Sequence, residues 1–181
     1  MNVPRIAPHL RDIHAPASLR DLPLWLVWRY ETYAGEPKPR KIPIYADGVK
    51  RHGQQGTPYD RAQLVTFAAA REAAVRRGMD GVGLALMHDA GVVALDFDHC
   101  VKGGVVDPVV LDLVSGTYAE YSPSGTGIRA FFSGDAGVLG NRKSRATEDL
   151  FAVEAFSSSG FVTVTGWMLD HVDLLGYEDR V

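Results

Sequence analysis

Two aspartates at the end of an apolar strand pattern have the clearest chemical potential in the sequence. Side chains alternate between faces along Val92–Asp98, so Asp96 and Asp98 share one face, about 6.5–7 Å apart. Their oxygens suit Mg²⁺ or Mn²⁺, and a bound cation would offset their mutual repulsion. Such a pair can hold two metals about 4 Å apart for phosphoryl chemistry. The alternative is that the strand ends here and both acids face water.

A small-residue loop, Ser122–Gly127 (Ser-Pro-Ser-Gly-Thr-Gly), is the second feature. Its backbone N–H groups could converge on an anion, and its hydroxyl groups add further donors. Arg129 follows closely, and its planar guanidinium fits phosphate oxygens. The loop lacks the Gly-Lys-Ser/Thr ending of a Walker A loop. The alternative is an ordinary Ser/Gly hairpin turn.

A third acid, Glu154, stands among apolar residues in Ala152–Phe156. It is a candidate third metal ligand, and the alternative is the polar face of a half-exposed strand. The histidines are scattered without metal-ligand spacing, and we assign none of them a function. Basic residues cluster at three places, which solvated loops explain most simply: Lys38/Arg40/Lys41, Lys50/Arg51 and Arg142/Lys143/Arg145.

The elements that must position these residues are mostly strands. Residues 81–87 and 91–98 are expected to form a hairpin that turns at 88–91. The remaining strands are expected at 24–30, 41–45, 118–122, 128–132, 150–157 and 161–165, with Pro43 marking an edge strand. Few helices set among many antiparallel strands indicate an α+β fold.

Two helices are predicted. One begins with Thr57 as N-cap, Pro58 at the first helical position and Asp60 as the capping acid, and it continues to Arg77 before Gly78. The residues expected on its buried stripe are Leu64, Phe67, Ala68 and Val75. The second, shorter helix begins at Asp107-Pro108 and ends by Gly116.

Composition excludes several classes of protein. The 181 residues suit one domain, and the charge of 19 − 22 = −3 argues against coating nucleic acid by bulk charge. The single cysteine, Cys100, excludes an internal disulfide and a cysteine-based zinc site. No apolar run reaches the roughly 20 residues of a membrane span, and no signal peptide is expected. We therefore expect no membrane partner and a cytoplasmic protein.

The order of these motifs resembles the archaeo-eukaryotic primase superfamily. In particular, the sequence resembles the primase–polymerase domains of phage, plasmid and prophage replication proteins, and the likeness covers roughly residues 22–168. Their pattern is Asp-x-Asp ending a strand, a Ser-x-Ser-Gly-x-Gly turn leading to a basic residue, and an acid on a later strand. The matching segments around these motifs are 25–28, 38–43, 81–84, 118–125 and 161–166.

The resemblance implies a catalytic core with an RRM-like antiparallel sheet beside a small N-terminal α/β unit. The expected organisation is an irregular lead-in at 1–20, a primase–polymerase domain at 21–170, and a C-terminal tail or the start of a linker at 171–181.

The resemblance also implies an activity: template-directed nucleotidyl transfer by a two-metal mechanism in the replication of a mobile element. Asp96, Asp98 and Glu154 would be the catalytic residues that hold Mg²⁺ or Mn²⁺. The implied partners are single-stranded DNA template, nucleoside triphosphates, and a helicase domain or protein. The implied nucleotide-binding residues are Ser124, Gly125, Thr126, Gly127, Arg129, Lys41 and Lys143.

The sequence departs from the superfamily at Arg129, where the second motif usually ends in histidine. Arginine can bind a triphosphate but cannot transfer a proton near neutral pH. Two alternatives to the enzyme therefore stay open. One is an accessory domain of a replication protein that binds nucleotide or single-stranded DNA with little catalysis. The other is a metal-dependent nuclease on a different fold.

Overall fold

A computed structural model describes residues 9–134, 142–144, 151–169 and 175–176. The helical elements are η1 (Leu10–Asp12), α1 (Ala17–Arg20), α2 (Pro58–Gln63), α3 (Phe67–Arg77) and α4 (Pro108–Val114). The strands are β1 (Trp25–Glu31), β2 (Arg40–Ile44), β3 (Gly81–Ala85), β4 (Val92–Asp98), β5 (Val101–Lys102), β6 (Val105–Val106), β7 (Tyr118–Tyr121), β8 (Ile128–Ser133), β9 (Arg142–Lys143), β10 (Ala152–Phe156), β11 (Phe161–Val164) and β12 (Leu175–Gly176). None of the helices among these residues has the length and apolar character to cross a membrane.

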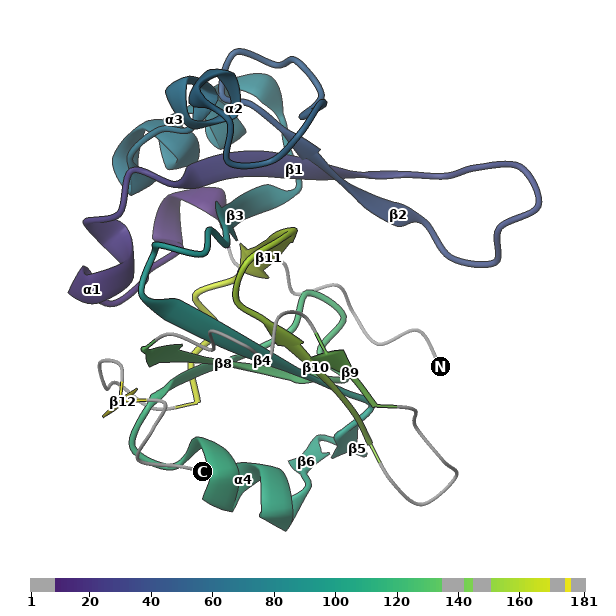
Figure 1. Cartoon of the computed structure of the whole chain (residues 1–181). Coiled ribbons are helices and arrows are strands. Elements are labelled where there is room, and N and C mark those ends of the chain that lie inside the picture. The colour runs from purple at the N-terminus through teal and green to yellow at the C-terminus, as the bar shows by residue number, and fades with distance from the viewer. Residues whose placement is uncertain (1–8, 135–141, 145–150, 170–174, 177–181) are drawn as a thin grey trace.

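The strands of the described residues form two main sheets and the small β5–β6 ribbon. Sheet A has the order β11-β3-β1-β2, and sheet B has the order β12-β8-β4-β10-β9, with β7 also paired to β8. The pairings are antiparallel except that β12 runs parallel to β8. Figure 1 shows sheet A with α1–α3 at one end of the molecule and sheet B with α4 at the other. The α+β class and the antiparallel sheets agree with the sequence.

Alternation along the strands of sheet B separates two faces. Phe97, Ile128 and Phe132 pack with α4 residues such as Val110 in one apolar cluster. The opposite face packs beneath sheet A, where Val92, Ala94, Tyr118 and Phe131 join the larger core. By the same alternation Asp96, Asp98 and Arg129 lie on the sheet A side, beyond the apolar part of that face.

The expected hairpin of residues 81–87 and 91–98 is wrong, because the two strands belong to different sheets. β3 pairs with β1 and β11, and β4 pairs with β8 and β10. Every residue of β3 is buried, and β4 is also largely buried. Each strand therefore has partners on both edges, and the turn at 88–91 carries the chain from sheet A to sheet B.

The single helix predicted from Thr57 to Arg77 is divided in two. Thr57 and Gly78 do cap the ends, but Leu64 has extended backbone, and Val65 exchanges two 3.0 Å backbone hydrogen bonds with Trp25 of β1. Thr66 then caps α3. The break changes the helical phase: Leu64 and Phe67 are buried as expected, but Val75 is half-buried and Ala68 is exposed. The other residues buried on α3 are Ala70, Ala73 and Ala74.

The expected irregular lead-in differs from the structure over its described part. Residues 10–20 contain η1 and α1, and Ile13 and Leu19 are buried in the core beneath sheet A. Leu19 also accepts a 3.0 Å hydrogen bond from Trp25 Nε1. Residues 10–20 therefore pack as part of the same core as the strands of sheet A.

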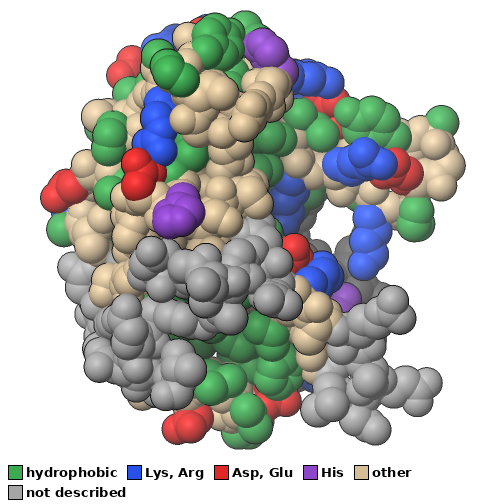
Figure 2. Space-filling view, viewed as in Figure 1, with side chains coloured by type: hydrophobic (Ala, Val, Ile, Leu, Met, Phe, Trp, Pro, Cys, Tyr) green, Lys and Arg blue, Asp and Glu red, His purple; other side chains and the backbone are tan. Residues whose placement is uncertain are grey.

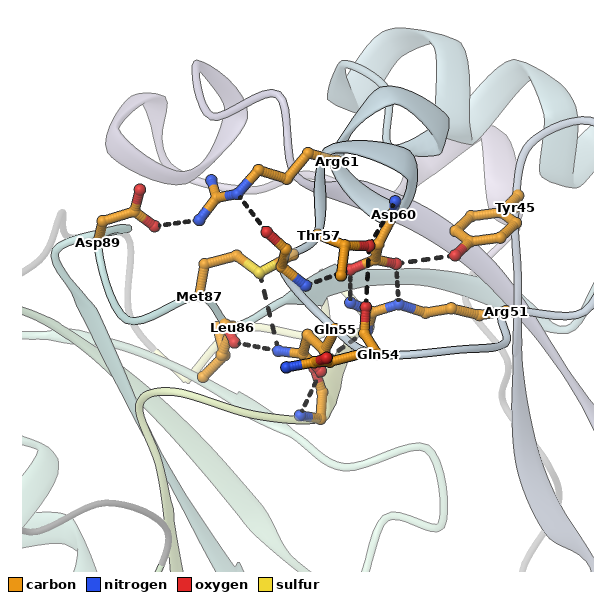
Figure 3. Close-up of polar contacts among 12 residues, drawn as sticks. Tyr45, Arg51, Gln54, Gln55, Thr57, Asp60, Arg61, Leu86, Met87 and Asp89 are labelled. Atoms are coloured by element: carbon orange, nitrogen blue, oxygen red, sulfur yellow. Dashed lines mark hydrogen bonds and ion pairs between the residues drawn. The ribbon is translucent and has the colours of Figure 1, made fainter.

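A buried ion pair fixes the connection between β2 and α2 (Figure 3). Asp60 is 1% exposed, and its carboxylate accepts from Arg51 (2.8 and 2.7 Å), from the Tyr45 hydroxyl (2.8 Å) and from Gly56 N (2.8 Å). Burial alone would raise the Asp60 pKa, but these donors lower it to about 2. Asp60, predicted as the capping acid of the helix, thus also forms an ion pair with Arg51 of the preceding loop.

Candidate functional site

Five charged residues form a row across sheet B. The register places Lys143 opposite Glu154, Glu154 opposite Asp96, Asp96 opposite Arg129, and Arg129 opposite Glu120. Directly opposed residues of antiparallel strands share a face, so the row lies on the side of sheet B that faces sheet A. The register therefore places Glu154 beside Asp96 on an adjacent antiparallel strand.

Two acids of the row, Asp96 and Glu154, form ion pairs with cations. Arg129 Nη2 lies 3.3 Å from Asp96 Oδ2, and Lys143 Nζ lies 2.7 Å from Glu154 Oε2. Asp96 Oδ1 is buried and has no hydrogen-bond partner in the described part of the chain. Among the described residues, no group of three or more His, Cys, Asp or Glu side chains is arranged to hold a metal ion. The carboxylates share a face, but in this structure their charges are balanced by Arg129 and Lys143.

Arg129 lies between the two sheets, and its side chain is only 5% exposed. Besides contacting Asp96, its guanidinium donates to Thr163 of β11, to the carbonyl oxygen at 3.2 Å and also to Oγ1. The guanidinium is therefore directed toward Asp96 and β11. However, the fork proposed for a triphosphate is occupied by contacts within the protein.

Glu120 continues this connection at the other end of the row. Its buried carboxylate accepts from the backbone N–H groups of Thr165 and Gly166 at 2.9–3.0 Å and from the Tyr118 hydroxyl at 2.8 Å. Burial raises the pKa of Glu120, while these donors and the Arg129 charge oppose the rise. Glu120 thus joins β7 to the segment after β11.

A cleft of about 400 Å³ opens beside the acidic end of β4. It is lined by Tyr30, Lys38, Pro39, Lys41, Asp98, His99, Ser124 and Thr126. Figure 2 shows a hollow beneath the arm formed by β1 and β2, with basic, acidic and histidine side chains around it. The structure therefore brings together four residues predicted for the site: Lys41, Asp98, Ser124 and Thr126.

The Ser122–Gly127 turn is held by its own hydrogen bonds, which include contacts of the Ser124 hydroxyl with those of Ser122 (3.0 Å) and Thr126 (2.9 Å). The N–H groups of Gly125, Thr126 and Gly127 donate within the turn, to Ser122 O, Ser124 Oγ and Ser122 Oγ. In this structure these N–H groups are therefore hydrogen-bonded within the turn itself. Gly127 is required for packing, since an added Cβ would lie 2.7 Å from Phe97 O.

Lys41 is half-buried at the cleft, and its pKa depends on this burial and on the charged residues nearby. Burial, and to a lesser extent the nearby Arg129 charge, lowers its pKa from 10.5 to about 8. Asp96 and Asp98 act in the opposite direction. Lys41 therefore responds electrostatically to both the charged row and the cleft.

Sequence reasoning missed several residues of this region. His99 lines the cleft directly after Asp98, although it was assigned no function. Lys38 was explained as part of a solvated loop, and Tyr30 only as part of a strand. Glu120 had a usable signal, because it is an acid within the otherwise uncharged strand Tyr118–Tyr121.

No protein-family model matches the sequence, and a search of curated proteins finds no significant match.

Proposed function

We propose that this chain is a primase–polymerase-type nucleotidyltransferase domain that acts in the replication of a mobile element. The observation that carries the proposal is the meeting of a row of acids with a donor-lined cleft at one end of β4. Asp98 connects the two, because it lies two residues from Asp96 on the same face of β4 and lines the cleft beside Lys41 and Ser124.

The strand order supports an RRM-like core. From β4 onward the chain forms β4, α4, β7, β8 and then β10, and these strands lie in the order β10-β4-β8-β7. Numbered along the chain, this is the 4-1-3-2 order of an RRM sheet. Sheet A with α1–α3 would then be the small N-terminal unit of such a domain, joined after β10 by β11.

The donor set fits Mg²⁺ or Mn²⁺. Asp96, Asp98 and Glu154 would hold the metal, since all three offer oxygen ligands on one face and Asp96 Oδ1 has no hydrogen-bond partner among the residues that the structure describes. Bound there, the metal would acidify an attacking hydroxyl and neutralise charge on the departing pyrophosphate. Lys143 would have to release Glu154 for this third ligand to take part.

The cleft residues suit the triphosphate of an incoming nucleotide. Lys38 and Lys41 supply positive charge, and Ser124 and Thr126 supply hydroxyl donors. Arg129 would act by orienting Asp96, because its guanidinium is occupied by Asp96 and Thr163. A 3′-hydroxyl of a primer, or of a first nucleotide, would be aligned on the side of the acids.

Nucleotide incorporation on a single-stranded template tests the proposal. The purified chain is supplied with labelled ribo- or deoxyribonucleotides and with Mg²⁺ or Mn²⁺, and it should form metal-dependent products. Asp98→Asn should lower the rate about 100-fold or more, because metal-assisted charge stabilisation contributes several kcal/mol. The matched control is Glu72→Gln, an exposed acid on α3. Equal rates in Asp98→Asn and wild type would overturn the assignment.

A second function is favoured by the ion pairs themselves. Arg129 and Lys143 already neutralise Asp96 and Glu154, as cations would in a domain that binds nucleotide or single-stranded DNA without catalysis. This alternative predicts metal-independent binding and no incorporation. Loss of labelled DNA without any need for added nucleotides would instead indicate a nuclease.

A further inference from the structure

His99 has an unusual backbone conformation. Its φ of +62° lies in the left-handed region, and every other described residue with positive φ is a glycine. Side chains make this conformation unfavourable, although histidine is among the residues that tolerate it best. A residue other than glycine at such a position points to a use for its side chain.

The contacts on either side explain why the backbone turns here. Cys100 is buried and its thiol donates to Phe97 O at 3.3 Å, while Val101 N donates to Thr126 O at 3.1 Å. The chain therefore reverses directly after Asp98, with Cys100 packed in the apolar cluster beneath α4 and His99 at the cleft. Glycine would allow the same reversal without strain.

The groups around His99 favour an anion. Lys38 and Lys41 offer positive charge, Ser124 and Thr126 offer hydroxyl groups that also contact each other at 2.9 Å, and Asp98 is the one carboxylate among the described lining residues. His99 is exposed, and its ring has no hydrogen-bond partner among the described residues. An imidazole N–H is thus available at the rim of a donor-rich cleft.

We propose that His99 contacts the triphosphate tail of the bound nucleotide through a ring N–H. This inference rests on the proposed nucleotide site, and it adds a nucleotide-binding residue that the motif pattern did not contain. The same phosphate chemistry occurs in a single-stranded DNA backbone, so the experiment must separate the two ligands.

Titration calorimetry tests the contact with ATP, dATP and inorganic tripolyphosphate, each with Mg²⁺, and with a short oligothymidylate. His99→Gly and His99→Asn should both lower the affinity for each of the three polyphosphate ligands about 10-fold. This is the effect expected when one hydrogen bond to a charged group is lost. Oligothymidylate binding should be unchanged. The melting temperature of His99→Gly should equal or exceed that of wild type, because the strain is relieved. The matched control is His88→Asn, an exposed histidine in the β3–β4 connection.

The outcomes separate the two proposals. Wild-type protein that binds none of the polyphosphates overturns both the nucleotide site and the His99 contact. If both His99 variants bind the polyphosphates as tightly as wild type does, the His99 contact alone is overturned. A loss confined to oligothymidylate also overturns it, and would assign His99 to the nucleic-acid backbone.

Discussion

Arg129 and Asp96 lie directly opposite each other on β8 and β4, with Nη2 3.3 Å from Oδ2. The same guanidinium donates to Thr163 of β11, so one side chain joins sheet B to sheet A beside the acidic row. The buried Arg129 charge therefore has a structural function in addition to any function in the site.

Arg129→Ala should destabilise the protein by about 3 kcal/mol, because it leaves Asp96 charged and half-buried without its partner. Arg129→Lys should recover part of this loss, since a single ammonium cannot reproduce the forked contacts to Asp96 and Thr163. Urea unfolding of the three proteins at pH 7 measures the effect. A free energy of unfolding unchanged in Arg129→Ala would contradict the structural function.

Asp60→Asn should destabilise the protein at neutral pH and have less effect in acid. The folded-state pKa of Asp60 is about 2 against an ordinary 3.8, so its contribution is present above pH 4 and is lost as the pH falls toward 2. The difference between wild type and variant should shrink by about 2 kcal/mol over that window. Urea unfolding at pH 7, 4 and 2.5 checks the trend, and a difference independent of pH would contradict it.

Lys143→Ala should tighten Mn²⁺ binding about 2- to 5-fold. Lys143 Nζ is 2.7 Å from Glu154 but is more than half exposed, so the competing ion pair contributes less than about 1 kcal/mol. Melting curves with increasing Mn²⁺ report the affinity, because the metal stabilises only the folded site. The control is Lys143→Ala combined with Glu154→Gln, in which the gain should disappear. Weaker Mn²⁺ binding in Lys143→Ala would contradict the assignment of Glu154 as a ligand.

The sequence was sufficient to predict that Asp96 and Asp98 share a face, but not which residues lie beside them on the neighbouring strands. Strand alternation has a fixed period of two, so Asp96 and Asp98 had to share a face once β4 was identified. The pairing of Asp96 with Arg129 depends on how the intervening residues 99–127 are accommodated. Strand register of this kind is set by long-range packing and not by the local pattern.

The errors have a similar physical origin. A short turn between two apolar strands is typical of a hairpin, yet β3 and β4 each found partners in different sheets. Likewise, helix propensity favoured one helix through Leu64 and Val65, but the bridge from Val65 to Trp25 interrupted it. In both cases tertiary pairing prevailed over local preference.

Lys41 offers a pH test of the cleft. Its folded-state pKa of about 8 lies below the ordinary 10.5, so burying its charged form destabilises the free protein below pH 8. Between pH 8 and 10.5 the unfolded chain holds a proton that the folded chain has released, and stability should rise with pH. Lys41→Met should remove this rise, as measured by urea unfolding between pH 7 and 10.

Nucleotide affinity should fall with rising pH as Lys41 loses its charge, whereas the stability of the free protein rises. A phosphate group favours charged Lys41, so affinity for ATP with Mg²⁺ should fall about 10-fold between pH 7.5 and 9.5 as the free protein loses that charge. Lys41→Arg stays charged throughout this range and should give a nearly flat profile. Lys38→Arg, an exposed lysine on the same arm, is the matched control and should retain the wild-type fall. A profile that falls equally in Lys41→Arg would mean that another group titrates, and that Lys41 does not contact the nucleotide.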